Sequence, residues 1–511
     1  MLSAVSGHLL LLARREKISL FSSGLVNEFI FNYLFIECIF WRPLCGEDKG
    51  EKNFLPEADS PRYLSKNFFG WSITVITIET ARPKRCAMNA EYSPLLMEWL
   101  KREVTPALGC TEPVAVAFAA ACAASYLPSS CESIRGFISA NLYKNAMGVT
   151  IPGTSVSGVA LAAAIGALGG DAQKGLQTLQ GISGAVVGQA QELVAAGAVA
   201  IEARDTADFI HIDLTLQAGE HCCRVVVIGA HTRVVGLYVD GAPVTIPQAG
   251  DGDQQRELAG FTVGEAFRFI SQIPAAEIAF MLEAARLNMA LSAEGRQRKY
   301  GLNINGTLAA AVESGMMSND LMSAIIINTV AASDARMGGA AVPAMSNFGS
   351  GNQGITATIP VVTVARHLNV DDDTLARALA LSHLVAISIH ARYTRLSALC
   401  AASTAAMGAA AGMAWLFSRD LKAVNSAIIN MVSDVSGIIC DGASNSCAMK
   451  VSSTVSSAFK AVLMALQQSQ ASANDGIVGE DVEQTIDNLC RLVVRPMAHT
   501  DKEIITIMAS K

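Results

Sequence analysis

Two cysteines flank a short polar turn in the sequence Cys440-Asp441-Gly442-Ala443-Ser444-Asn445-Ser446-Cys447. The Asp-Gly pair favours a tight turn, and Ser444 or Asn445 can cap the helix that we expect after it. A helix N-terminus favours the thiolate form of a nearby cysteine, and thiolates are the usual ligands of iron–sulfur clusters. The spacing therefore indicates a pair of metal ligands, although two buried cysteines beside a turn would give the same pattern.

Another cysteine lies in the Gly-Cys-Thr-Glu-Pro turn at 109–113. Pro106 ends the preceding segment, and Thr111 is a good N-cap with a proline in the first turn of the helix. Cys110 is thus expected just before a helix N-terminus, where the pKa of a thiol falls and the thiolate can act as a base or nucleophile. The alternative is a structural cysteine packed under the start of the helix.

A glycine-rich stretch, residues 346–354 (Ser-Asn-Phe-Gly-Ser-Gly-Asn-Gln-Gly), precedes a segment with a helical pattern. Glycines let a backbone come close to a ligand, and backbone amides can bind an anion such as a carboxylate. The stretch lacks the Gly-Lys-Ser/Thr of a nucleotide-binding loop. We expect Ser350, Gly351, Asn352 and Gln353 to bind a substrate carboxylate, and a flexible turn is the alternative.

Three other polar side chains could take part in binding. Lys144 is the one cation of the glycine-punctuated segment 144–154 and could contact the same carboxylate, although a lone lysine is more often solvated. His383 and His390 are seven residues apart and so share a helix face, but no carboxylate is paired with them. We therefore favour core or interface histidines over metal ligands.

The elements that must position these residues fall into three regions. Residues 88–133 have a helical pattern, residues 134–260 mix strands and helices, and residues 261–511 are almost wholly helical. The prediction is an α+β fold with a large, mainly helical domain and a smaller mixed α/β domain. In the mixed region, alternation predicts strands at 198–203, 209–217, 222–228 and 234–239, and helices at 158–168 and 172–195.

The composition limits the class of function. With 511 residues, 51% of them hydrophobic and 16% charged, and a net charge of -7, the chain can bury large cores. It has no basic runs, so it is a poor candidate for binding nucleic acid. Residues 396–417 are uncharged and long enough to span a bilayer, but small residues dominate them, so we expect a buried helix and no membrane partner. Twelve cysteines without a secreted disulfide pattern or a clean signal peptide indicate reduced thiols in the cytoplasm.

The first 87 residues differ from the rest. They hold 12 of the 30 aromatic residues, and Ala/Gly-rich helical sequence begins after Met88. We expect residues 1–87 to be a poorly ordered, non-native extension with few contacts to the body, Met88 being the true start. An added domain or a membrane-proximal anchor is the alternative.

Taken together, the Gly-Cys-Thr-Glu-Pro turn, the glycine-rich stretch and the Cys-Asp-Gly-Ala-x-x-x-Cys-Ala-x-Lys element resemble the L-cysteine desulfidase family. That family is related to the alpha chain of the iron–sulfur L-serine dehydratases. The resemblance runs from about Met88 to the C-terminus. It implies a 4Fe–4S cluster in the helical domain, bound by Cys400, Cys440 and Cys447, and a catalytic base at Cys110. Cys400, in an Ala-rich segment, is assigned through the resemblance alone.

The resemblance also implies a reaction on a small amino acid. Three thiolates leave one iron open as a Lewis acid for the leaving sulfur of L-cysteine, while Cys110 as thiolate removes the α-proton. The products are pyruvate, ammonia and hydrogen sulfide. An L-serine dehydratase with the same cluster is the main alternative; a pyridoxal phosphate enzyme, a transport protein and a non-catalytic cluster-bearing sensor are others. The sequence leaves the oligomeric state open, a homo-oligomer included.

Overall fold

The computed structural model describes residues 64–68, 71–75, 92–245, 260–393 and 396–510. The chain forms two compact units, Met1–Cys86 and Ala87–Lys511. In the first unit the structure describes an antiparallel hairpin of β1 (Leu64–Phe68) and β2 (Trp71–Val75). The remainder of the predicted N-terminal extension lies outside the described residues, so its expected poor order stays a prediction.

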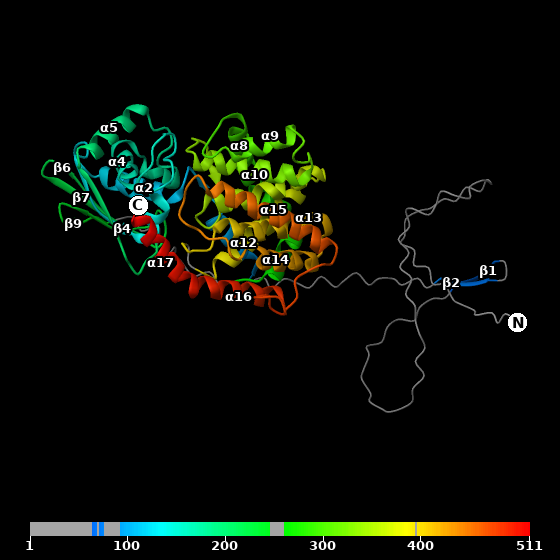
Figure 1. Ribbon diagram of the computed structural model, residues 1–511. Coiled ribbons are helices and arrows are strands. Elements are labelled where there is room, and N and C mark those ends of the chain that lie inside the picture. The colour runs from blue at the N-terminus through cyan, green and yellow to red at the C-terminus, as the bar shows by residue number, and fades with distance from the viewer. Residues whose placement is uncertain (1–63, 69–70, 76–91, 246–259, 394–395, 511) are drawn as a thin grey trace, which may run out of the picture. The chain divides into compact units, whose positions relative to one another are not determined.

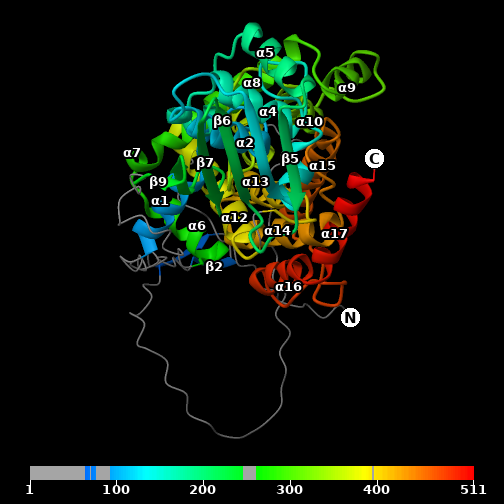
Figure 2. The same cartoon turned by 90° about the vertical axis from the view of Figure 1, so that its left-hand side faces the viewer.

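A six-stranded sheet forms the α/β part of the second unit, in the order β5-β4-β6-β7-β8-β9 (Figure 2). β4 and β5 are parallel, and the other neighbours are antiparallel. Along β7, Cys223, Val225 and Val227 are buried, whereas the intervening Arg224 is exposed, as strand alternation requires. Helices α2 and α4 pack against each other, and their apolar side chains form one hydrophobic core with the buried face of the sheet. The strands are β4 (Ser133–Ser139), β5 (Val199–Arg204), β6 (His211–Ala218), β7 (His221–Ile228), β8 (Val234–Val239) and β9 (Ala242–Pro243), and the helices are α2 (Thr111–Ala124), α3 (Ala140–Ala146), α4 (Val159–Gly169) and α5 (Gly184–Ala195).

Two local expectations differ from this part of the structure. The helix predicted over 172–195 is a 3-10 helix, η1 (Ala172–Gln177), followed by a turn and then α5. Gly175 and Gly181 have φ angles of 53° and 85°, which interrupt a continuous right-handed helix. β4 was not among the predicted strands, because its central Gly136 weakens the alternating pattern that identifies a strand.

The helical part is built around α13, on which α11, α12, α14 and α15 pack (Figure 1). Small residues allow this close packing: a Cβ on Gly408 would lie 2.3 Å from the Ser382 carbonyl oxygen. The apolar stretch 396–417 is therefore largely a buried helix, as predicted, and no helix in the described part of the chain is long and apolar enough to cross a membrane. The helices are α1 (Tyr92–Glu103), α6 (Val263–Gln272), α7 (Ala275–Ile278), η2 (Ala279–Met281), α8 (Leu282–Gln297), α9 (Ile304–Glu313), α10 (Leu321–Met337), α11 (Gly351–His367), α12 (Asp372–His390), α13 (Ala401–Ser418), α14 (Leu421–Val435), α15 (Cys447–Leu466), α16 (Val482–Val494) and α17 (Pro496–Ala509).

The last two helices connect the two parts of this unit. α16 packs on α14, and α17 packs on α3 beside the sheet (Figure 1). The fold is thus α+β with a large helical portion, which confirms the predicted class. The predicted boundaries at residues 133 and 260 stay a prediction.

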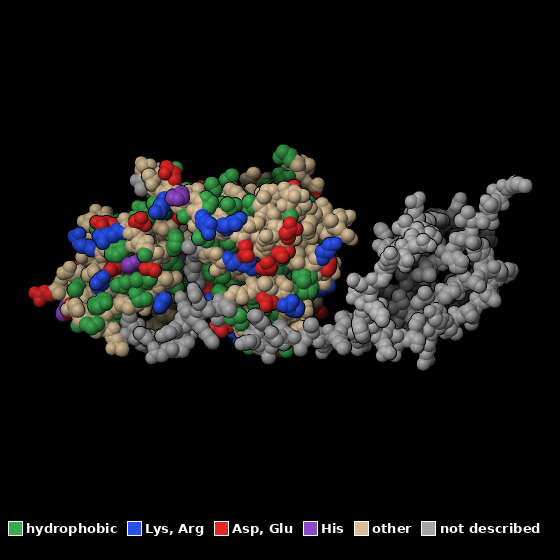
Figure 3. All heavy atoms as spheres, turned by 90° about the horizontal axis from the view of Figure 1, so that it is seen from below, with side chains coloured by type: hydrophobic (Ala, Val, Ile, Leu, Met, Phe, Trp, Pro, Cys, Tyr) green, Lys and Arg blue, Asp and Glu red, His purple; other side chains and the backbone are tan. Residues whose placement is uncertain are grey.

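On the face seen in Figure 3, Lys and Arg side chains are interspersed with Asp and Glu.

Candidate functional site

One cavity, of about 90 Å³, brings together four of the nine described cysteines, all nine of which are free thiols. Its walls come from the starts of α2, α11, α13 and α15, the ends of α3, α10 and α12, and the loops before α13 and α15. The predicted residues Ser350 and Asn352 line it, whereas Lys144, Gly351 and Gln353 do not. The four thiols are those of Cys110, Cys400, Cys440 and Cys447.

Backbone pairing holds Cys400 beside Cys440. The N–H of Cys400 donates to the Ile438 carbonyl (3.0 Å), and the N–H of Cys440 donates to the Ala398 carbonyl (2.7 Å). These bonds flank an isolated antiparallel bridge between the two loops. Cys400 is also the N-cap of α13, so its thiol sits at a helix start. Two segments that are distant in sequence therefore present their thiols to the same cavity.

Cys447 begins α15, directly after the turn that the sequence predicted. Gly442 in that turn has a φ of 94°, and a Cβ there would lie 2.6 Å from the Lys144 carbonyl oxygen, so the turn requires glycine. The N–H of Ser444 donates to Sγ of Cys447 (3.5 Å), the kind of bond that tunes cluster thiolates. The N-cap of α15 is Ser446, later in the chain than the predicted caps, and its side chain makes no capping bond.

Burial disfavours the ionisation of two of the three candidate ligands, Cys400 and Cys447. Burial, followed by repulsion from Cys440, raises the pKa of Cys400 to about 12 and that of Cys447 to about 11. Three thiolates can coexist here only if a positively charged group neutralises them, which iron does on binding. Among the residues that the structure describes, no group of three or more His, Cys, Asp or Glu could hold a single metal ion. A 4Fe–4S cluster is larger than an ion and its ligands stand further apart, so an all-thiol donor set at one cavity fits a cluster.

Cys110, rather than the predicted Thr111, is the N-cap of α2. Its thiol donates a hydrogen bond to Oε2 of Glu112 (3.0 Å), and the Thr111 hydroxyl donates to the same oxygen. Burial and then repulsion from Glu112 raise the pKa of Cys110 well above its usual range, and Arg336 opposes them only in part. The expected fall in this pKa is therefore wrong, because complete burial beside a carboxylate outweighs the effect of the helix start.

The glycine-rich stretch is tied to the Cys110 turn by a short strand pair, β3 (Pro106–Ala107) and β10 (Ala344–Met345). Ser350 caps α11 by accepting a hydrogen bond from the Gln353 N–H (3.3 Å). Gln353 is buried behind the cavity wall, where its amide contacts Asn347 (2.8 Å) and Nδ1 of His390 (2.7 Å). Its side chain therefore orients His390 of the wall and does not line the cavity itself.

Gly351 makes room for a neighbouring side chain. A Cβ at this position would lie 2.1 Å from Nε of Arg336 and 2.6 Å from its Cζ. The sequence interpretation assigned this glycine to close approach by a ligand. In the structure the group that comes close is a guanidinium.

Lys144 has a different environment from the one expected. It is 1% exposed, forms an ion pair with Asp501 of α17, and its Nζ lies 3.4 Å from the Cys440 carbonyl oxygen, to which it donates. This geometry ties the C-terminal helix to the cysteine loop, and Lys144 itself does not line the cavity.

The histidines separate into two roles. His383 is fully buried between Asn347 (3.0 Å) and Thr358 (3.0 Å), and desolvation lowers its pKa to about 3. This is the core histidine that the sequence favoured. His390 lines the cavity, stacked between Phe348 and Tyr393 with ring centroids 4.5 Å from each.

The sequence analysis gave no site role to several polar residues of the cavity wall, among them Arg336, Asn145 and His390. Arg336 ends an apolar helix, where a basic residue is common because it complements the helix dipole. Asn145 directly follows Lys144, and no local pattern distinguishes it from a solvated loop residue. The seven-residue spacing of the histidines places both on one helix face, but it does not show which of the two faces a cavity.

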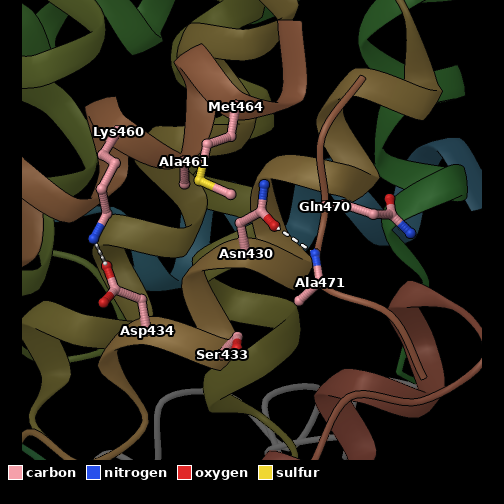
Figure 4. Close-up of a pocket in the computed structure, with 8 residues that line it drawn as sticks. All are labelled: Asn430, Ser433, Asp434, Lys460, Ala461, Met464, Gln470 and Ala471. Atoms are coloured by element: carbon pink, nitrogen blue, oxygen red, sulfur yellow. Dashed lines mark hydrogen bonds and ion pairs between the residues drawn. The ribbon is translucent and has the colours of Figure 1, made fainter. Parts of the chain in front are cut away.

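A second cavity, of about 350 Å³, lies between α14 and α15 (Figure 4). Several of its polar groups are paired with protein groups: Lys460 with Asp434 (2.8 Å), and the Asn430 amide with the Ala471 N–H (3.0 Å) and the Ser469 carbonyl (3.0 Å). None of its lining residues is a cysteine. The smaller, thiol-lined cavity is therefore the candidate site.

Comparison with known proteins gives the family. Residues 226–506, more than half of the chain, match the family model described as serine dehydratase alpha chain. A UPF0597 protein of Klebsiella pneumoniae is 68% identical over 425 residues, which cover 83% of this chain and all of the relative. The UPF0597 protein YhaM of Escherichia coli is 51% identical over 432 residues, 83% of this chain and 99% of the relative. The chain belongs to the UPF0597 family, a family related to the serine dehydratase alpha chain.

Proposed function

We propose that this chain is an iron–sulfur lyase that converts L-cysteine and water to pyruvate, ammonia and hydrogen sulfide by α,β-elimination. The main observation in support of this proposal is that Cys110, Cys400, Cys440 and Cys447, from four separate segments, line one cavity. The match to the serine dehydratase alpha chain supports a lyase-like reaction on a small amino acid. The reduced thiols that this chemistry needs fit a cytoplasmic enzyme.

Cys400, Cys440 and Cys447 would hold a 4Fe–4S cluster. Such a cluster would supply Lewis-acid chemistry to this cavity when bound. The chain contributes helix starts behind Cys400 and Cys447, where backbone amides favour thiolate. Burial is the main cause that raises the pKa of both thiols, and Lys450, which forms an ion pair with Asp441 on the loop before α15, opposes that rise only in part.

Cys110 is the proposed base for the α-proton. The carboxylate of Glu112, at hydrogen-bond distance from Sγ, can accept the thiol proton and leave the thiolate that abstraction requires. Loss of sulfide from the resulting carbanion gives aminoacrylate, which tautomerises to an imine. Water then hydrolyses the imine to pyruvate and ammonia.

L-serine dehydration at the same site is the second candidate, and the family match favours it. Both reactions use an α-proton base and a Lewis acid, and they differ in the leaving atom. A competition between L-cysteine and L-serine on anaerobically prepared protein distinguishes them. Sulfide release from L-cysteine that exceeds pyruvate formation from L-serine supports the desulfidase, and the reverse order supports the dehydratase.

The cluster is tested by iron and acid-labile sulfide content of the same anaerobic protein. Cys440→Ser should lose both, together with turnover, because one of the three cluster thiolates is removed. Cys222→Ser is the matched control: Cys222 is also partly buried, but it lies on β7 outside the cavity. Full activity of Cys440→Ser, or active protein without iron, rules out the cluster mechanism.

A further inference from the structure

Arg336 is a buried cation with no acidic partner in the part of the chain that the structure describes. Its side chain is 3% exposed and lines the thiol cavity. Nε donates to the Gly109 carbonyl (3.0 Å), and Nη1 contacts Sδ of Met337 (3.3 Å). A buried charge is costly unless it is paired, so a cation in this position indicates an anionic ligand.

The guanidinium is held in place before any ligand binds. The Gly109 carbonyl fixes Nε on one side, and the missing side chain of Gly351 provides the space on another. A planar guanidinium fixed in this way can offer parallel N–H donors to both oxygens of a carboxylate. The glycine-rich stretch thereby serves carboxylate binding indirectly, through the arginine that it accommodates.

The same cavity contains acceptors for a positive group. Oδ1 of Asn145 is buried and has no hydrogen-bond partner among the described residues, and the whole residue is 5% exposed. Glu112 is 9% exposed and also lines the cavity. Glu112 and Arg336 both line this cavity, and Oε2 of Glu112 accepts its hydrogen bonds from Cys110 and Thr111 rather than from the guanidinium. Two opposite charges that share a cavity without pairing leave room for a ligand that bears both signs.

We propose that the cavity recognises the zwitterion of an α-amino acid, with Arg336 binding the carboxylate and Asn145 together with Glu112 binding the ammonium while Glu112 is still ionised, before the Cys110 proton moves to it. The inference deepens the proposed function, on which it rests for the identity of the ligand as an amino acid. It assigns both charged ends of that substrate to named residues. The recognition does not depend on the leaving atom, so L-cysteine and L-serine share it.

The test uses anaerobic holoenzyme and three ligands that cannot undergo the elimination. L-Alanine carries both charges, propionate lacks the ammonium, and ethylamine lacks the carboxylate. Calorimetric or NMR titration of the unaltered protein should give an affinity for L-alanine at least roughly tenfold higher than for either fragment. Equal affinity for L-alanine and a fragment overturns the proposal, whatever the variants do.

The variants assign each charge to a residue. Arg336→Gln should weaken L-alanine binding by roughly tenfold or more and leave ethylamine unchanged, because ethylamine never used the guanidinium. Glu112→Gln should weaken L-alanine and leave propionate unchanged. Arg336→Lys should give an intermediate loss, because the charge remains but the bidentate geometry does not. Arg296→Gln, at an exposed arginine of α8, is the control and should bind L-alanine normally.

The outcomes separate this inference from the proposed function. If the protein carries no cluster or releases no sulfide, yet L-alanine binding still depends on Arg336, the proposed reaction falls and the zwitterion site stands. If sulfide is released from L-cysteine but Arg336→Gln keeps both the KM for L-cysteine and the affinity for L-alanine, the zwitterion site is wrong.

Discussion

Sγ of Cys110 lies 3.0 Å from Oε2 of Glu112, and both side chains are buried at the first turn of α2. The thiol donates this hydrogen bond, so the resting pair is a neutral thiol beside a carboxylate. Burial and the carboxylate keep the pKa of Cys110 high, and a thiolate forms only when its proton moves to an acceptor. Glu112 is the acceptor in contact.

Removing this thiol should stop turnover without removing the cluster. We expect Cys110→Ala to lower kcat by about 10²–10⁴, the usual contribution of a positioned base, while iron content and cluster absorbance stay unchanged. Cys131→Ala is the control, since Cys131 is similarly buried but lies outside the cavity. Loss of iron in Cys110→Ala would instead make Cys110 a cluster ligand.

The cysteine loop was predictable from sequence, and Cys400 was not, for a physical reason. The spacing from Cys440 to Cys447 is local, so a turn and a helix start can be inferred from neighbouring residues. Cys400 is placed by two backbone hydrogen bonds, one from its own N–H to the Ile438 carbonyl and one from the Cys440 N–H to the Ala398 carbonyl. Both bonds form only when two segments that are distant in sequence pair. No local pattern in an Ala-rich segment encodes that pairing, and the family resemblance was the only signal.

Arg336 and Lys144 show the same limit for charged side chains. Lys144 was expected at a ligand, but its partner is Asp501, 357 residues later in the chain. Arg336 gives no sequence signal of a site, because a basic residue at a helix end has an ordinary local explanation. The difference between the two residues lies in their tertiary contacts. Lys144 is buried against the carboxylate of Asp501, whereas Arg336 lies beside Gly351 and an open cavity.

The Lys144–Asp501 ion pair should be essential for stability and dispensable for binding. Asp501→Asn leaves a buried ammonium unpaired and should lower the free energy of unfolding by about 3–5 kcal/mol. The double variant Lys144→Met/Asp501→Leu removes both charges and should recover most of that loss. Its KM for L-cysteine should stay unchanged, as measured on anaerobic protein.

The exposed pair of Arg204 and Glu202 is the control for that experiment, since Glu202→Gln should change the free energy of unfolding by less than about 1 kcal/mol. A raised KM in the stable double variant would return Lys144 to the substrate, as the sequence first suggested. A double variant as unstable as Asp501→Asn would show that the loss comes from packing at α17.

The buried imidazole of His383 should make stability depend on acid pH. Desolvation lowers its pKa in the fold from 6.5 to about 3, so between these values the unfolded chain binds a proton that the folded chain does not. Its contribution is therefore fully present above pH 6.5 and is lost as the pH falls toward about 3. The expected slope is about 1.4 kcal/mol per pH unit in that window.

Denaturant unfolding of unaltered protein and His383→Gln across this range measures the difference in slope. Carboxylates titrate in both proteins and cancel, so the comparison isolates the one imidazole. His499→Gln, at an exposed histidine of α17, should keep the slope of the unaltered protein. Identical slopes for all three would mean that His383 is not held neutral by burial.

A single methyl group at Gly351 should mimic the loss of Arg336. Gly351 begins α11 without a positive φ, so alanine is compatible with its backbone, and the added Cβ would meet the guanidinium at 2.1 Å. Because the end of an arginine side chain can move, we expect displacement of the guanidinium rather than unfolding. Gly351→Ala should therefore raise the KM for L-cysteine and weaken L-alanine binding by roughly tenfold or more, with stability and iron content preserved. Gly188→Ala is the control and should leave binding unchanged, because no atom lies within 4 Å of the new Cβ in α5. Tight L-alanine binding by Gly351→Ala would show that the space at Gly351 is not needed for the function of Arg336.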